Sequence, residues 1–529
     1  MIRPGEPTVE ELMARIAALQ AENRQLTERV VKLEEELALA RLHRFAPKSE
    51  KHIDRLFNEA EQVADEDDAG GEDGGVVDLP DTGFASAGKP EGKKRGRKPL
   101  PEHLPRERVE YDLTDDQKAC PCCLHQMHRM GEAVTEQLHI EVKAKVLQNV
   151  RFKYACRHCD RTGINTPVVI APMPAQPLPG SIATASTLAF ALVHKYVDGT
   201  PLYRLAQAFE RAGVPVSRGA LGHWVIGSSE KHLSRIYDAL KLRLRSQPLI
   251  HGDETTVQVL KEKDREATST SFMWAYRSGE DSHEPIVLLD YQPGRGQIYP
   301  QAFLGDYRGI LMSDGYSAWR TLAGATHLGC MAHSRRRFVD ALKARKKGGG
   351  PPEQALKFFE QLYRIESQAR SEKPDIAAGT DKDETQADCI RRFRQQHSVP
   401  ILNALKAWLD DITPKVLPDS KIGDAVSYTL NQWEYLTRYT EDGRMPIDNN
   451  LLERDIRIFA TGRKSWLFSD TVDGARASAV VYSLMLTCRA CDIEPLAYMR
   501  HVLSELPQRA TDADITDLLP FNFPKAAAA

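Results

Sequence analysis

The sequence lacks the long hydrophobic runs that a membrane-spanning protein needs. No apolar stretch in its 529 residues approaches the ~20 residues that a helix needs to cross a bilayer. The first residues, Met-Ile-Arg-Pro-Gly-Glu, also lack the apolar segment of a secretory signal peptide. We therefore expect no membrane partner and a cytoplasmic location. At this length we expect several domains, since one domain typically spans ~100–200 residues.

Cysteine is scarce, which argues against a disulfide framework. The chain has 9 cysteines, and five of them lie between Cys120 and Cys159. This clustering, without a signal peptide, favours metal binding in a reducing compartment.

The clustered cysteines predict a zinc-binding module over residues 111–170. Two Cys-x-x-Cys pairs can each supply two thiolates from one tight turn to a tetrahedral, structural Zn²⁺ ion. The expected ligands are Cys120, Cys123, Cys156 and Cys159. Cys122 breaks the spacing, and His158 is an alternative to one of the cysteines. Alternating apolar residues between the pairs indicate strands, so the module is zinc-ribbon-like or β-rich.

The net charge of −3 excludes little, because it averages segments of opposite sign. Residues 59–88 predict a disordered linker, since the stretch from Glu59 to Asp81 has ten acidic residues and no basic ones. Residues 89–110 are basic. Their Arg95-Gly-Arg97-Lys98 core suits an extended backbone lying along a narrow minor groove of DNA. A solvated basic tail is the alternative.

Residues 8–43 carry the heptad pattern of a coiled coil. Apolar residues recur in steps of three and four over more than four heptads. Ile16 and Val30 at a positions, with leucine at d, favour two parallel strands, and Asn23 at an a position would fix the register. We expect a homodimer or higher oligomer through this segment. The alternative is an amphipathic helix packed on its own protein.

Residues 182–245 have a helical pattern. Within them, 201–213 and 218–225 resemble a helix-turn-helix whose second helix would be capped by Ser217 and face a major groove. An ordinary helical hairpin is the alternative.

From residue 247 the pattern changes to strands, and the whole chain predicts a multidomain α+β protein. Strands are expected at 248–260, 272–277, 285–291, 309–313 and 326–331, with a helix at 297–304 before the fourth. This order fits a ribonuclease H-like α/β catalytic core. The core would consist of 247–342 and 446–505, with a helical insertion at 343–445 and a C-terminal tail at 506–529.

Three carboxylates in this region predict two-metal phosphoryl-transfer chemistry. Asp253 and Asp314 end apolar runs, and Glu453 lies in a segment with helical spacing. Hard cations prefer oxygen ligands, and two of them can clamp the attacking and leaving oxygens at phosphorus. Each has a plainer alternative. Glu254 could replace Asp253, Asp314 could be a turn residue, and Glu453 could form a capping box with Asn450.

Basic residues near these acids are candidate DNA contacts. Guanidinium groups suit bidentate phosphate binding, and an indole can stack on an unpaired base. The candidates are Arg335, Arg336, Arg454, Arg457, Arg463, Lys464 and Trp466. A solvated charged face is the alternative for some of the arginines.

Nine motifs resemble transposases of the insertion-sequence-66 family, over nearly the full length. They are Phe45-Ala-Pro-Lys-Ser-Glu-Lys, Arg95-Gly-Arg-Lys-Pro-Leu-Pro, Cys120-Pro-Cys-Cys, Lys195-Tyr-Val-Asp-Gly-Thr-Pro-Leu-Tyr-Arg, His251-Gly-Asp-Glu-Thr, Ser313-Asp-Gly-Tyr, Cys330-Met-Ala-His-Ser-Arg-Arg-Arg-Phe, Asp448-Asn-Asn-Leu-Leu-Glu-Arg and Gly462-Arg-Lys-Ser-Trp-Leu-Phe. The resemblance implies a DDE triad at Asp253, Asp314 and Glu453, and binding of terminal inverted repeats and target DNA. It also implies two small accessory proteins encoded beside the transposase, in a bacterial, nucleoid-associated setting.

The sequence departs from the family pattern at a few positions. Leu124 and His125 stand where glycines are usual after the first cysteines, and Ser465 stands where asparagine is expected. Cys330 and His333 match a family Cys-x-x-His pair that could support the active site or bind a further metal.

We therefore expect a Mg²⁺- or Mn²⁺-dependent transposase. A non-catalytic DNA-binding regulator and a structure-specific nuclease of the same fold are the alternatives. Strand-transfer products would separate the nuclease from the transposase.

Overall fold

The computed structural model describes residues 9–45, 108, 144–155, 168–345, 349–372 and 385–525. The acidic segment 59–88, the Arg95-Gly-Arg97-Lys98 segment and the four expected zinc-ligating cysteines lie outside these ranges. The chain divides into two compact units. The larger unit comprises residues 1–72, 174–210 and 215–523, and the smaller comprises 73–173, 211–214 and 524–529. In the smaller unit β1 (Lys153–Ala155) pairs with β2 (Val168–Ile170) in antiparallel fashion.

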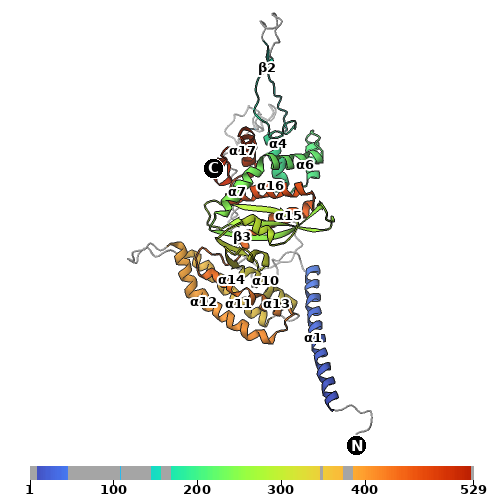
Figure 1. The fold of residues 1–529 in the computed structure, drawn as a ribbon, viewed down its shortest axis with the longest axis vertical. Coiled ribbons are helices and arrows are strands. Elements are labelled where there is room, and N and C mark those ends of the chain that lie inside the picture. The colour runs from blue at the N-terminus through green and yellow to red at the C-terminus, as the bar shows by residue number, and fades with distance from the viewer. Residues whose placement is uncertain are drawn as a thin grey trace, which may run out of the picture. The chain divides into compact units, whose positions relative to one another are not determined.

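A mixed sheet of six strands forms the centre of the larger unit (Figure 1). Its strands are β3 (Leu249–Lys261), β4 (Thr270–Ser278), β5 (Val287–Gln292), β6 (Ile310–Ser313), β7 (Thr326–Gly329) and β8 (Ser469–Thr471). The order is β5-β4-β3-β6-β7, and β8 also pairs with β3. The pairs β3–β4 and β4–β5 are antiparallel, whereas β6 runs parallel to both β3 and β7. The expected mixed α+β architecture is thereby confirmed.

The strands lie within two residues of their expected positions at each end, and the last one is the instructive exception. The expected strand 326–331 ends at Gly329, and helix α10 begins at Met331. The Met331 N–H donates to the Ile447 carbonyl at 3.1 Å instead of continuing the sheet. Apolar character continues across this boundary, so the sequence pattern could not mark it.

Helices complete the larger unit. Around the sheet lie α4 (Ala185–Tyr196), α5 (Leu202–Arg211), α6 (Arg218–Ser228), a π-helical turn (Ser229–Leu233), α7 (Ser234–Arg245), α8 (Ile298–Leu304), α9 (Ser317–Arg320), α15 (Asn450–Trp466), α16 (Val472–Ala490) and α17 (Pro495–Glu505). Short 3-10 turns cover Thr413–Lys415, Arg438–Thr440, Leu506–Gln508, Thr516–Leu518 and Pro520–Asn522. Ser217 caps α6 as expected, since its Oγ accepts the Ala220 N–H at 3.1 Å.

Helix α16 satisfies the backbone of strand β5. The Ser483 Oγ accepts the Leu289 N–H at 2.7 Å, and the Thr487 Oγ1 accepts the Val287 N–H at 3.0 Å. Unpaired N–H groups on a strand at the end of a sheet invite pairing with other chains. The buried hydroxyls of α16 remove that liability and hold the helix against the sheet.

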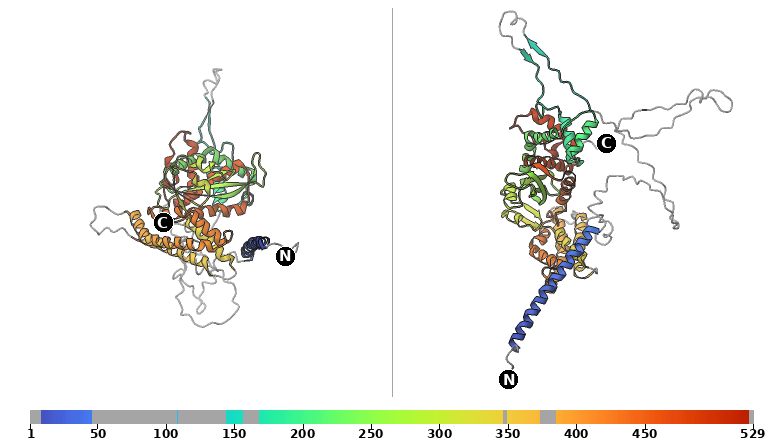
Figure 2. Two further views of the ribbon diagram at one scale, coloured as in Figure 1. Left: turned by 60° about the horizontal axis from the view of Figure 1, so that its bottom comes forward. Right: turned by 90° about the vertical axis from the view of Figure 1, so that its right-hand side faces the viewer.

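A group of helices follows β7 in the sequence and packs against the part of the sheet formed by β6 and β7. It consists of α10 (Met331–Ala344), α11 (Pro351–Ser371), α12 (Gln386–Ile412), α13 (Lys421–Asn431) and α14 (Trp433–Thr437) (Figure 2). Its buried core includes Phe338 and extends to Met312 of β6 and Leu328 of β7. Inside it, the buried Arg394 guanidinium binds the Glu366 carboxylate at 2.7 Å. The group is therefore packed onto the strand edge that carries the candidate site.

Helix α1 (Val9–Phe45) spans most of the expected heptad segment. Most of its heptad side chains are exposed, with Ile16, Leu26 and Leu33 each more than half accessible to solvent. No other part of the described chain covers these three side chains, so they are available to a coiled-coil partner. Self-association through α1 stays a prediction. Near the C-terminal end of α1, Val31 and Leu39 are half-buried, and the Glu35 Oε2 accepts the Lys421 N–H at 2.8 Å. Across the ranges that the structure describes, we find no helix with the length and apolar character needed to cross a membrane.

Candidate active site

The parallel pairing of β3 and β6 brings Asp253 and Asp314 side by side. The register pairs Leu249 with Ile310 and His251 with Met312. If this register is continued two residues beyond its last pair, Asp253 falls opposite Asp314, which directly follows β6. Neighbouring strands lie only ~4.8 Å apart. Two carboxylates that are 61 positions apart in the sequence thus come close enough at the end of β6 for the charge of Asp314 to raise the pKa of Asp253.

Strand alternation separates Asp253 from Glu254. A Cβ added at Gly252 would lie 2.5 Å from the Trp319 ring, so the Gly252 side of β3 faces that indole. Glu254 lies on the same side, where its carboxylate accepts the Trp319 Nε1–H at 3.0 Å and the Arg295 Nε–H at 2.7 Å. Asp253 points to the other face. Glu254 is already compensated by Arg295, which favours Asp253 as the cation ligand.

Hydrogen bonds from Asn449 fix the start of α15 on β3. Its Nδ2 donates to the Gly252 carbonyl at 3.2 Å, and its Oδ1 lies 2.8 Å from the His251 Nδ1. All three groups are buried or backbone, so the attachment is shielded from water. Glu453 lies one turn beyond Asn449, which carries its carboxylate to the face of β3 that bears Asp253.

Glu453 does not cap its own helix. The N-cap residue is Asn449 rather than Asn450, and it makes no side-chain capping bond. The Glu453 Oε2 instead accepts a hydrogen bond from the Arg336 Nη2 at 2.8 Å. The capping-box alternative is therefore wrong, because the helix starts one residue earlier than that motif requires.

The three carboxylates influence one another electrostatically. The pKa of Asp253 lies well above its ordinary range, chiefly because its side chain is buried and then because of the negative charge of Glu254. Asp314 and Glu453 raise it further, and the Glu254 N–H opposes the shift. A bound divalent cation would offset this repulsion. Carboxylate oxygens are the donors that Mg²⁺ and Mn²⁺ prefer.

Backbone N–H groups orient both aspartates. The Asp253 Oδ1 accepts the N–H of Glu254 at 2.8 Å, and the Asp314 Oδ1 accepts the N–H of Tyr316 at 2.9 Å. One oxygen of each carboxylate is thus anchored, and the second is not used by these bonds. Together with Glu453, these acids offer only oxygen donors, the donor type that a hard divalent ion prefers.

No sequence pattern predicted a role for His251 or Asn449, although both lie in the motifs that contain Asp253 and Glu453. Burial lowers the pKa of His251 to about 4, while its bond to Asn449 opposes the shift. The imidazole is therefore neutral near pH 7, and its role is to hydrogen-bond Asn449 and so link β3 to α15. The signal that could have exposed these residues is their position, two residues before Asp253 and four before Glu453.

Cys330 and His333 lie beside Glu453. The Asn449 N–H donates to the Cys330 Sγ at 3.2 Å, and the His333 Nδ1 lies 3.5 Å from the Glu453 Oε1. Both residues are at the start of α10, which follows β7 directly. The Cys-x-x-His pair is thus next to the carboxylate of Glu453, which follows His333 by 120 residues in the sequence.

Several of the basic candidates lie around the carboxylates. Arg335 and Arg336 are on α10, and Arg336 contacts Glu453 as described. Arg463, near the end of α15, donates to the Thr256 Oγ1 on β3 at 3.0 Å, and Lys464 beside it is exposed.

Trp466 is partly buried, and much of its surface is used within the protein. Its Nε1 lies 3.3 Å from the Tyr482 hydroxyl, and its ring packs edge-on against Phe459. The Lys195 ammonium lies 5.6 Å from the indole. A base could stack only on the remaining exposed part of this ring.

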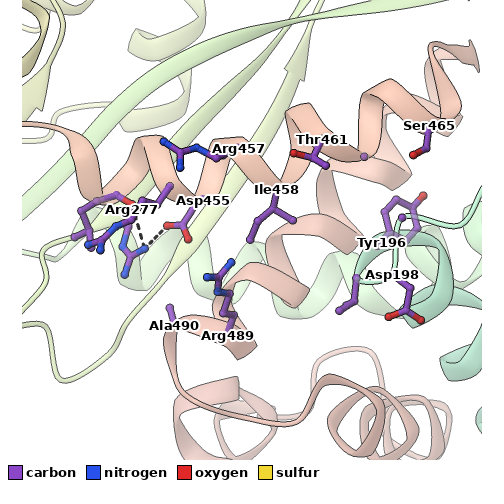
Figure 3. A pocket seen from close by; sticks show the side chains of 15 residues that line it. Tyr196, Asp198, Arg277, Asp455, Arg457, Ile458, Thr461, Ser465, Arg489 and Ala490 are labelled. Carbon is purple, nitrogen blue, oxygen red and sulfur yellow. Dashed lines mark hydrogen bonds and ion pairs between the residues drawn. The ribbon is translucent and has the colours of Figure 1, made fainter. Parts of the chain in front are cut away.

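A recess of about 590 Å³ lies on another face of α15 (Figure 3). Its basic lining residues are Arg277, Arg454, Arg457 and Arg489, and its hydroxyl groups include Thr461 and Ser465. Arg277 is paired with Asp455. None of the three carboxylates lines the recess. Helix α15 therefore carries an acidic residue of the candidate site and a separate basic surface.

Comparison with protein-family models gives four matches along the chain. Residues 180–477 match the model described as Transposase IS66 family. Residues 117–160 match the zinc-finger binding domain of transposase IS66, and residues 483–521 match the IS66 C-terminal element. Residues 32–109 match a model described as Transposase C of IS166 homeodomain.

Curated proteins of Sinorhizobium fredii strain NGR234 are similar over most of this chain. The uncharacterized protein y4jD is 32% identical over 446 residues, covering 80% of this chain and 81% of its own. The uncharacterized protein y4qI is 31% identical over 454 residues, covering 83% and 79%. The similarity therefore extends well beyond the catalytic region.

Proposed function

The chain belongs to the IS66 transposase family, and from this we propose that it is a DDE transposase that cleaves and joins DNA at the ends of an insertion sequence. The family model spans residues 180–477, which include all three candidate carboxylates. Membership in the family implies a DNA-cleaving transposase in general. The identity of the triad, its metal ions and its DNA sites are the parts that we propose.

One observation carries the assignment of the triad. The β3–β6 pairing brings the segments before Asp253 and Asp314 together, and the Asn449 bonds attach the start of α15, which carries Glu453, to β3 beside Asp253; this supports the triad. Turn residues or capping residues would have no reason to converge from three distant segments. The pKa of Asp253 is raised chiefly by burial and then by Glu254, and the smaller contributions of Asp314 and Glu453 support their nearness to it.

The strand order supports a ribonuclease H-like core. Three antiparallel strands followed by two parallel ones, in the order β5-β4-β3-β6-β7, match the arrangement expected from the sequence. The first strand carries one aspartate, the fourth is followed by the second, and a later helix carries the glutamate. The helical group between β7 and α15 is then an insertion within this core.

In the proposed mechanism the protein positions the reacting groups. Asp253 would hold both of two Mg²⁺ or Mn²⁺ ions, and Asp314 and Glu453 one each. When bound, such ions stabilise the charge on the attacking and leaving oxygens and promote ionisation of the attacking water. Arg336, beside Glu453, would bind a phosphate oxygen of the substrate. The 3′-hydroxyl released by cleavage would then attack target DNA in the same site.

DNA recognition is proposed to use surfaces outside the triad. The zinc module with Cys120, Cys123, Cys156 and Cys159, the segment Arg95–Lys98, and the α5–α6 helices would bind the terminal inverted repeats. Arg454 and Arg457 in the recess on α15, with Arg335, Arg463 and Lys464, would hold the backbone. A dimer through α1 would bring two element ends together, with small accessory proteins as further partners.

The test is magnesium-dependent cleavage and strand transfer with labelled element-end DNA. Asp253→Asn should abolish both reactions, a loss of at least about 10²-fold because a ligand common to both ions is removed, and should leave DNA binding intact. Asp281→Asn is the matched control, because Asp281 is an exposed loop residue and should not change activity. Strand transfer retained by Asp253→Asn would reject the triad, and tight binding without cleavage by wild type would favour a regulator.

A further inference from the structure

A mixed sulfur, nitrogen and oxygen donor set lies at the junction of α10 and α15. The donor atoms of Cys330, His333 and Glu453 all lie within 4.8 Å of one another. Zn²⁺ binds sulfur at ~2.3 Å and nitrogen or oxygen at ~2.0–2.2 Å. Small side-chain rotations would therefore place one ion within reach of all three donors.

Two of these donors are buried without a hydrogen-bond partner. The His333 Nδ1 and the Glu453 Oε1 have no such partner among the described residues, although both atoms are shielded from solvent. Leaving a buried polar atom without a hydrogen-bond partner destabilises the folded protein. These two atoms face each other at 3.5 Å, and a shared cation would satisfy both.

The third donor is oriented by the protein backbone. Cys330 is fully buried, and its Sγ accepts the Asn449 N–H at 3.2 Å. Cys330 is also the N-cap residue of α10, where the helix dipole favours negative charge. One thiolate and one carboxylate would balance the charge of a divalent ion, with a neutral imidazole as the third ligand, so a buried complex would carry no net charge.

We propose that Cys330, His333 and Glu453 form a binding site for a thiophilic divalent ion such as Zn²⁺, distinct from the all-oxygen magnesium site. Three protein ligands leave a fourth position for water. Soft thiolate and imidazole donors select Zn²⁺ over Mg²⁺. On the proposed function, the two sites share Glu453, so Zn²⁺ bound here competes with the magnesium role of that carboxylate and inhibits DNA cleavage.

The first experiment counts metal without any DNA. Full-length protein is equilibrated with Zn²⁺, freed of excess ion and analysed by inductively coupled plasma mass spectrometry. Cys330→Ser and His333→Gln should each hold one equivalent less than wild type. Cys488→Ser and His283→Gln are the matched controls, because Cys488 is buried in α16 and His283 is exposed in a loop, and both should keep the wild-type content. Equal zinc content in all five proteins would overturn the proposal.

Circular dichroism checks that each variant folds. If Cys330→Ser does not fold because Cys330 is buried, the zinc content of His333→Gln alone decides the test. The second experiment measures magnesium-dependent cleavage with and without added Zn²⁺, as a ratio for each variant. Zinc should inhibit wild type at least about tenfold more strongly than His333→Gln. If His333→Gln loses one zinc equivalent but is inhibited by Zn²⁺ as strongly as wild type, the metal site is supported and its effect on cleavage is rejected. Absence of any cleavage would count against the proposed function alone.

Discussion

At the scale of single residues, close backbone approach and burial determine the candidate site. Gly252 lets β3 pass against the Trp319 ring, and His251 ties the same strand to Asn449. Neither residue is one of the three carboxylates, yet both set where Asp253 points. Changes at these supporting positions should therefore alter stability and activity together.

Gly252→Ala should destabilise the protein, because its Cβ would lie 2.5 Å from the Trp319 ring. Overpacking of this kind typically costs ~1–3 kcal/mol, and the displaced strand should also reduce cleavage. Urea denaturation would measure the change in the free energy of unfolding. Gly222→Ala should do the opposite, since Gly222 lies inside α6 with nothing within 4 Å of an added Cβ. There, loss of unfolded-state freedom should stabilise by ~0.4–1 kcal/mol.

His251 should make stability fall as the solution becomes acidic. Its pKa is lowered from 6.5 to about 4 in the folded state, so the unfolded chain takes up a proton more readily. Stability is then fully present above pH 6.5 and declines as the pH falls toward 4, by on the order of 3 kcal/mol. His251→Gln should flatten this part of a curve of melting temperature against pH, whereas the exposed His283→Gln should leave it unchanged. If the melting temperature of His251→Gln falls with acid as steeply as that of wild type, His251 is not the source of the pH dependence.

At the scale of elements, helices α15 and α1 differ in what holds them in place. Helix α15 is held by hydrogen bonds to β3, so its direction is determined inside the chain. Helix α1 presents exposed apolar residues in a heptad pattern, so its stability depends on a partner. The expected helix is present, and its self-association is left for a measurement in solution.

Leu26→Asp should weaken or abolish dimerisation, because a charge would be buried at a d position of the proposed coiled coil. Light scattering coupled to size-exclusion chromatography should show wild type as a dimer or larger and the variant as a monomer. Glu28→Gln changes a residue on the outer face of the heptad and should leave the mass unchanged. An unaltered mass for Leu26→Asp would show that any oligomer forms elsewhere.

At the scale of the whole molecule, acidic and basic surfaces are separated on a chain of nearly neutral net charge. Asp253, Asp314 and Glu453 are close enough to influence one another electrostatically, while Arg454 and Arg457 line a recess that none of the three borders. On the proposed function, a polyanionic substrate needs this separation, because the acids would hold cations and the arginines would hold phosphates. The average charge of the sequence conceals it.

The double substitution of Arg454 and Arg457 by alanine should weaken DNA binding in a salt-dependent way. Each lost phosphate contact reduces the slope of log K against log salt by about 0.9, so the slope should fall by roughly two. Fluorescence anisotropy over a series of salt concentrations would measure it. Lys343→Ala with Lys357→Ala removes the same charge from the helical group and should leave the slope nearly unchanged. Equal slopes in all three proteins would remove the recess from the DNA-binding surface.

The sequence by itself determined the features that depend on local spacing. Heptads predict α1, alternating runs predict the strands, and paired cysteines predict the zinc module that the family comparison also finds. The three acids were identifiable because each follows or lies within a recognisable element. These signals are local, since side-chain direction along a helix or strand repeats every few residues.

The tertiary structure decided what lies between distant segments. Only the fold shows that Asp253 and Glu254 point to opposite faces of β3, with Glu254 bound to Arg295 and Trp319. Only packing shows that Glu453 meets Arg336 and His333 instead of capping its helix. Strand register and helix docking join residues that are 61 to 198 positions apart, and no local period in the sequence encodes such distances.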